Sequence, residues 1–187
     1  MLKILAIIGV LILLGAAFVV IYALTQPDDF RIARSKAIAA PPEKIFPLIN
    51  DLHRFNEWNP FAKGDPNLEI AYSGPDSGKG ATHSWDSTGR SGKGRLEITD
   101  VSAPSKIAMQ LDILKPVEGH NNVLFTLQPN GDATEVTWAM TGKTPFIGKM
   151  MCLFFSMDRM IGGEFEKGLA DLKAIAEGRA PVPAGQS

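Results

Sequence analysis

The sequence has little cysteine and little histidine, and these shortages exclude several classes of protein. The single cysteine, Cys152, has no second thiol in the chain, so a disulfide-stapled scaffold is excluded. The three histidines, His53, His83 and His120, lack the short spacings at which zinc modules place their ligands. We therefore expect neither a bound metal ion nor another cofactor.

An excess of charge of one sign is also missing. The chain carries 19 Lys and Arg residues against 20 Asp and Glu residues, which gives a formal net charge of -1. Without a basic field to attract phosphates, a dedicated nucleic-acid-binding protein is not expected. At 187 residues, the chain is long enough for one domain plus an appendage but not for two full domains, which take ~100–200 residues each.

Recognisable catalytic motifs are absent as well. The sequence contains no G-x-S-x-G elbow and no H-E-x-x-H zinc motif. Residues 78–80 (GKG) lack the flanking strand, helix and hydroxyl residue of a phosphate-binding loop. The motifs therefore identify no catalytic residue, and a purely catalytic role is not indicated.

One long hydrophobic run is present at the start of the chain. Residues 4–24 contain no charge, and 19 of the 21 are apolar. As a helix they reach about 31 Å, close to the thickness of a bilayer core. We therefore expect an uncleaved membrane anchor over residues 1–24 and a polar linker over 25–29. A cleaved signal peptide and a buried core helix are the alternatives, although the run is long for a signal and no A-x-A-like site follows it.

The flanking charges leave the side of the membrane open. Lys3 precedes the run, whereas Arg31, Arg34 and Lys36 follow it, and this excess alone favours a cytoplasmic domain. Long domains, however, cross membranes largely regardless of their charge, and the short basic start is typical of an export signal that is retained. We favour the extracytoplasmic side for a single-pass protein.

Alternating hydrophobic residues dominate the middle of the chain and predict β-strands with one buried face. The inward positions are Leu68, Ile70, Tyr72, Leu96, Ile98, Ile107, Met109, Leu111, Ile113, Val123, Phe125, Leu127, Val136, Trp138 and Met140. Turn-forming segments separate most of these strands, for example residues 129–132 (PNGD). Short strands joined by tight turns predict an antiparallel sheet.

Helical patterns lie on both sides of the predicted sheet. Two prolines and Glu43 open a short helix that ends near Asn50. Apolar residues at helical spacing over 161–176 predict a long amphipathic C-terminal helix. The apolar faces of sheet and helix are buried together when the helix lies across the sheet, so we expect an α+β domain over residues 30–177. Residues 178–187 are rich in Pro, Gly and Ala and predict a disordered tail.

The order of elements and several motifs resemble the START-like, polyketide cyclase/dehydrase superfamily, also called SRPBCC. The resemblance is carried by residues 40–46 (APPEKIF), 78–80 (GKG) with Trp85, 125–127 (FTL), 134–138 (TEVTW) and 166–173 (EKGLADLK). It is strongest to a membrane-anchored branch with no assigned reaction. The resemblance implies a helix-grip fold, in which a curved antiparallel sheet surrounds the C-terminal helix and the two enclose a cavity for an apolar molecule or lipid. His83 departs from the family, where we expect an aromatic residue.

Under this resemblance, the inward-facing residues become candidate ligand-binding residues. They are Trp58, His83, Trp85, Leu96, Ile98, Met109, Leu111, Phe125, Leu127, Trp138, Met140, Phe165 and Leu169. The same residues suit an ordinary filled core, and the pattern alone does not separate the two roles. Trp and Met offer large polarizable surfaces, which suit an apolar pocket.

Three functional hypotheses follow. The first is membrane-anchored binding of a hydrophobic small molecule or lipid. The second is a cyclase/dehydrase-type enzyme acting on the bound ligand, with His83 as a weak candidate for the acid or base because its strand position directs it inward. The third is a non-catalytic interaction module at the membrane that uses the apolar segment 146–161. For this segment we favour a buried helical turn that leads into the long helix, and a pliable gate over the cavity mouth is the alternative. No protein partner is indicated.

Overall fold

The computed structural model describes residues 2–25, 27–89, 91–144, 148–149 and 156–180, without the side chains at positions 2, 5, 6, 16 and 23. Its strands are β1 (Asp29–Ile38), β2 (Leu68–Ser73), β3 (Thr82–Ser87), β4 (Lys93–Ser102), β5 (Lys106–Lys115), β6 (Gly119–Asn130) and β7 (Ala133–Lys143). Its helices include α1 (Leu2–Thr25), α2 (Pro42–Asn50), α3 (Leu52–Trp58), α4 (Pro60–Lys63) and α6 (Met157–Ala176).

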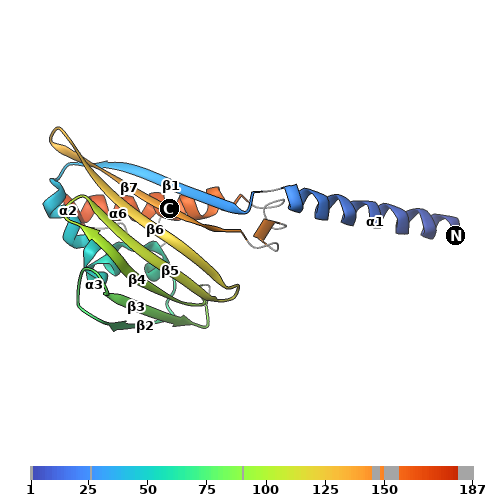
Figure 1. Ribbon diagram of the computed structural model, residues 1–187, viewed down its shortest axis with the longest axis horizontal. Helices are drawn as coiled ribbons and strands as arrows, with labels where there is room; N and C mark the ends of the chain where they lie inside the picture. Colours follow the sequence, from blue (N-terminus) through green and yellow to red (C-terminus); the bar gives the residue numbers. More distant parts are fainter. Residues whose placement is uncertain (1, 26, 90, 145–147, 150–155, 181–187) are drawn as a thin grey trace.

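The seven strands form one antiparallel sheet in the order β1-β7-β6-β5-β4-β3-β2. Strands β2 to β7 follow one another as a meander, and β1 completes the sheet by pairing with β7. The sheet curves around α6, while α2 and α3 lie on the same side (Figure 1). The expected α+β class with a helix-grip arrangement is therefore confirmed.

An ionic clamp joins α6 to the edge strand β1. The Nε atom of Arg34 lies 2.7 Å from Oε1 of Glu166, and its Nη2 atom lies 3.0 Å from Oδ2 of Asp158. A Cβ atom at Gly162 would lie 2.1 Å from Nη2 of Arg34, so the absence of a side chain there lets the guanidinium lie against the helix. The clamp fixes the C-terminal helix across the sheet.

Three short helices cover the rest of the concave face. Asp51 caps α3 by accepting hydrogen bonds from the backbone N–H groups of His53 and Arg54. Asn59 caps α4 in the same way, accepting from the N–H group of Phe61. Because each cap redirects the chain, the segment folds over the sheet and places Trp58 at the centre of the core.

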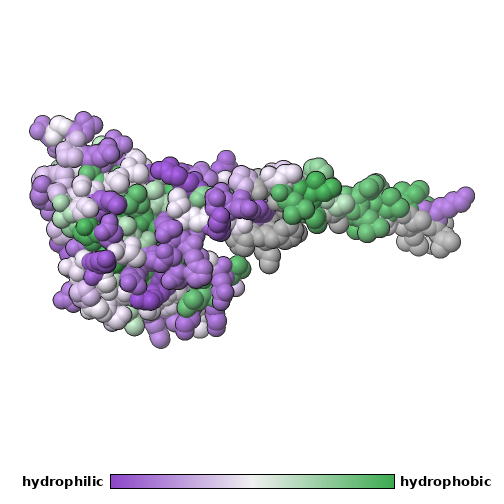
Figure 2. All heavy atoms as spheres, in the orientation of Figure 1, coloured by the Kyte–Doolittle hydropathy of each residue, from purple (hydrophilic) through white to green (hydrophobic). Residues whose placement is uncertain are grey.

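Residues 2–25 form a single helix, α1, that extends away from the domain (Figure 1). Apolar residues run along it, whereas the domain surface is a mixture of polar and apolar residues (Figure 2). Across the described residues, however, no helix combines the length and apolarity needed to cross a membrane. This finding contradicts the prediction of a transmembrane anchor and of a single-pass protein with an extracytoplasmic domain.

Candidate ligand-binding site

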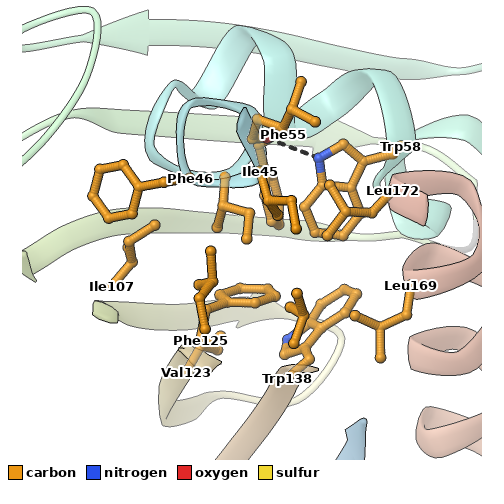
Figure 3. Close-up of a cluster of buried hydrophobic side chains, with 14 of the residues drawn as sticks. Ile45, Phe46, Phe55, Trp58, Ile107, Val123, Phe125, Trp138, Leu169 and Leu172 are labelled. Atoms are coloured by element: carbon orange, nitrogen blue, oxygen red, sulfur yellow. Dashed lines mark hydrogen bonds between the residues drawn. The ribbon is translucent and has the colours of Figure 1, made fainter. Parts of the chain in front are cut away.

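Five aromatic rings pack together between the sheet and the helices. Trp138 from β7 stacks on Phe165 from α6, with 4.1 Å between ring centroids and 10° between ring planes. Phe125 from β6 lies 5.1 Å from Trp138, and Trp58 and Phe55 from α3 contact both sheet residues at 5.6–6.3 Å. We call this set the aromatic cluster. Figure 3 shows Trp138 and Phe125 facing Trp58 and Leu169 from the helices.

The structure brings the predicted site residues together. Ten of the thirteen are buried members of one hydrophobic core: Trp58, Leu96, Ile98, Met109, Phe125, Leu127, Trp138, Met140, Phe165 and Leu169. Trp85 and Leu111 are partly buried and pack against that core, and His83 lies beside Phe55 at 6.4 Å between ring centroids. All thirteen therefore belong to one region on the concave side of the sheet, and their ligand-binding role remains a prediction.

A polar network borders the aromatic cluster where α3 approaches β2 and β3. Asn59 donates a hydrogen bond to Oδ1 of Asn56 at 3.1 Å. The Nδ2 group of Asn56 donates to the hydroxyl of Tyr72 at 2.9 Å and lies 3.4 Å from Nδ1 of His83. The ring of His53 stacks on Tyr72 with 3.7 Å between centroids. We call His53, Asn56, Tyr72 and His83 the polar rim.

The imidazole of His83 is held in its neutral form. Burial lowers the pKa of His83 from its usual 6.5 to about 4, since the charged ring would lose its hydration. Asn56 offers its N–H group to Nδ1, so Nδ1 acts as the acceptor and the ring proton resides on Nε2. His83 can therefore donate a hydrogen bond from Nε2 at neutral pH, whereas it is a weak base.

A buried carboxylate shapes the hairpin that carries Trp85. Asp65 accepts hydrogen bonds from the Ser87 hydroxyl at 2.8 Å and from the Ser91 N–H group at 2.9 Å. These bonds favour the charged form and lower the pKa of Asp65 to about 2. The backbone carbonyl of Ser91 in turn accepts from the indole of Trp85 at 3.0 Å. The hairpin thus fixes the orientation of Trp85 at the edge of the core.

Two hollows lie outside the aromatic cluster. One, of about 110 Å³, is lined in part by His53 and Tyr72 at the polar rim. The other, of about 300 Å³, lies on the opposite face of the sheet over Ala108, Leu124 and Ala139. Neither is the expected cavity between the sheet and α6, a space in which the aromatic cluster is packed. Of the segment 146–161, residues 146–147 and 150–155, including Cys152, lie outside the described residues.

Sequence reasoning missed most of the polar rim. Tyr72 was assigned to the inward face of its strand, yet its pairing opposite His83 depends on the register of β2 with β3. Asn56 carries no motif of its own, and its spacing of three residues from both His53 and Asn59 is the only local signal that these side chains share one helix face.

An antiparallel sheet that grips a long C-terminal helix over a cluster of aromatic rings defines a helix-grip α+β protein. The chain belongs to the family described as polyketide cyclase/dehydrase and lipid transport, which matches residues 29–177. The predicted superfamily is thus confirmed, whereas the membrane-anchored branch is not shown.

Solved structures share this fold at low sequence identity. A protein from Chromobacterium violaceum is 15% identical, with a TM-score of 0.57 over 81% of this chain and 99% of that one. A protein from Arthrobacter aurescens is 14% identical, with a TM-score of 0.57 over 86% and 92%. DynU16, from the dynemicin biosynthetic locus, is 15% identical, with a TM-score of 0.55 over 83% and 49%. Comparison with curated proteins gives no match.

Proposed function

We propose that the domain binds a hydrophobic small molecule or lipid against the aromatic cluster, between the sheet and α6. The observation that carries this proposal is the cluster itself, with five rings between sheet and helices in a chain of this family. Aromatic faces offer large contact areas with few rotatable bonds, and such surfaces dominate apolar binding sites.

Side chains in the same core as the aromatic cluster can change conformation to accommodate a ligand. Met109 and Met140 are buried in the same hydrophobic core, and the unbranched Met side chain adjusts its shape at low cost. A ligand that buries about 300 Å² of apolar surface gains about 7 kcal/mol before ordering costs are subtracted. Ordering the ligand and opening the packed rings take up part of this gain, so we expect a Kd above about 10 µM.

The polar rim is the entrance in this proposal. Tyr72 is 38% exposed, so the rim reaches solvent there, and Phe55 is the member of the cluster that lies next to His83 of the rim. The Phe55 ring lies 6.4 Å from that of His83 and 6.3 Å from that of Trp138. Movement of Phe55 therefore opens a path from the polar rim to the centre of the cluster.

We expect Phe55→Leu to weaken binding of the neutral fluorophore N-phenyl-1-naphthylamine by about three- to tenfold, because an aromatic contact is lost. The measurement is a fluorescence titration of the full chain. Phe30→Leu is the matched control, since Phe30 lies on the edge strand outside the cluster. The exposed apolar side chains of α1 also offer the probe a surface, which is unchanged in both variants. Equal affinities in both variants would contradict binding at the cluster.

Cyclase-type chemistry is a second candidate, favoured by the state of His83. A neutral imidazole that donates from Nε2 can polarise a carbonyl without prior protonation. Under this candidate function, His83→Gln retains ligand binding and loses turnover, whereas a carrier binds the ligand with or without the substitution and converts it in neither form.

A further inference from the structure

The three tryptophans differ in what their indole N–H groups contact. Trp58 donates to the backbone carbonyl of Leu48 at 2.8 Å, and Trp85 donates to that of Ser91 at 3.0 Å. Nε1 of Trp138 is buried and, in the described part of the chain, has no hydrogen-bond partner. Buried polar groups are normally paired, so this N–H group calls for a physical explanation.

The described neighbours of Trp138 hold its ring in place, and none of them accepts a hydrogen bond from Nε1. One face stacks on Phe165, and a Cβ atom at Gly168 would lie 2.9 Å from Cζ3 of Trp138 and 2.9 Å from Cδ of Pro60. Glycine at this position is therefore what allows the close approach of α6 to the indole. The nearby Phe125 ring, tilted by 34° at 5.1 Å, offers at most the weak acceptor of an aromatic face.

We propose that the ligand carries an oxygen atom that accepts a hydrogen bond from Nε1–H of Trp138. This inference rests on the proposed function, because it places the ligand in the aromatic cluster. The oxygen is a neutral ketone, ester or hydroxyl oxygen on an otherwise apolar molecule. A carboxylate is disfavoured, since the rings around Trp138 carry no charge and a buried anion without a counter-ion is costly.

A ligand acceptor at this position would explain why the Nε1–H group of Trp138 has no partner within the described chain. The N–H group has no partner among the described residues, and a ligand that supplies an acceptor satisfies it on binding. A hydrocarbon of the same shape gains the aromatic contacts but leaves the donor unpaired. Discrimination therefore depends on one oxygen atom, as it does in other sites with a buried polar group.

Two isosteric probes test this inference. 2-Acetylnaphthalene and 2-isopropenylnaphthalene differ by a carbonyl oxygen in place of a methylene group. Each is titrated into the full-length ¹⁵N-labelled chain, and the three indole resonances are assigned with single Trp→Phe variants. We expect the ketone, and not the alkene, to move the Trp138 indole proton downfield. The ratio of alkene Kd to ketone Kd should fall by about five- to tenfold in Trp138→Phe.

The controls separate the inference from the proposed function. Trp85→Phe should keep the wild-type ratio, since the Trp85 N–H group is already paired with Ser91. If both probes bind at the cluster with the same effect on the Trp138 indole, the inference is overturned and the proposed function stands. If neither probe perturbs any cluster residue, both are overturned. The shift in the wild-type protein decides the matter if Trp138→Phe does not fold.

Discussion

Trp58→Ala is expected to lower the free energy of unfolding by about 3–5 kcal/mol, the usual cost of truncating a buried aromatic residue. Trp58 is fully buried and contacts Phe55, Phe125 and Trp138 edge-on. Its removal also leaves the carbonyl of Leu48 without its indole donor. Chemical denaturation of the full chain measures this loss.

Trp58→Phe separates the two contributions. It retains most of the ring volume but loses the hydrogen bond to Leu48, so we expect a smaller cost, of about 1–2 kcal/mol. A loss below about 1 kcal/mol for Trp58→Ala would contradict a packed aromatic cluster, because a side chain that already borders an empty cavity leaves less contact to lose.

Lowering the pH from 6.5 to 4 is expected to remove about 3 kcal/mol of stability through His83 alone. The pKa of His83 is about 4 in the folded chain and about 6.5 when the ring is solvated. Between these values the unfolded chain binds the extra proton, so acid favours unfolding. The contribution is fully present above pH 6.5 and is lost as the pH falls toward 4. Denaturation curves across this range measure the effect.

His83→Gln should remove most of the pH dependence between pH 6.5 and about 5, where His83 dominates. His120→Gln is the matched control and should retain it, because the His120 side chain is 75% exposed. The carboxylates of Asp65 and Glu177 act mainly at lower pH. Hydrogen bonds hold the pKa of each near 2, so their contribution begins to be lost as the pH falls below about 5, through the usual carboxyl range, and overlaps only the acid end of the titration range of His83. An unchanged slope in His83→Gln would show that His83 is not buried in its neutral form.

Period-two patterns predicted the central strands well because one face of each is apolar and buried. Strand β1 was not predicted, and its chemistry explains why. Arg34 occupies an inward position between Ile32 and Ile38, where it pairs with Asp158 and Glu166. A charged residue on the inner face breaks the apolar alternation, and its partners lie more than 120 residues away in the sequence.

The candidate site was predicted in its residues but not in its packing. The alternation of apolar and polar residues along the strands correctly predicts that Met109, Phe125 and Trp138 face inward. Residues that line a cavity and residues that fill a core, however, give the same pattern. The contacts of Asn56 depend on tertiary structure, since its partners come from different elements. The apolar run over 4–24 predicted a helix, and α1 is one, but the membrane-spanning role assigned to it was wrong.

The central claim is that the aromatic cluster holds a hydrophobic molecule. Native mass spectrometry of the full chain, purified from its host and followed by organic extraction, tests this claim most directly. We expect an apolar molecule bound at one copy per chain and released on extraction, with an oxygen acceptor in its structure. A chain that purifies without any bound molecule and takes up no hydrophobic fluorophore at the cluster would contradict it.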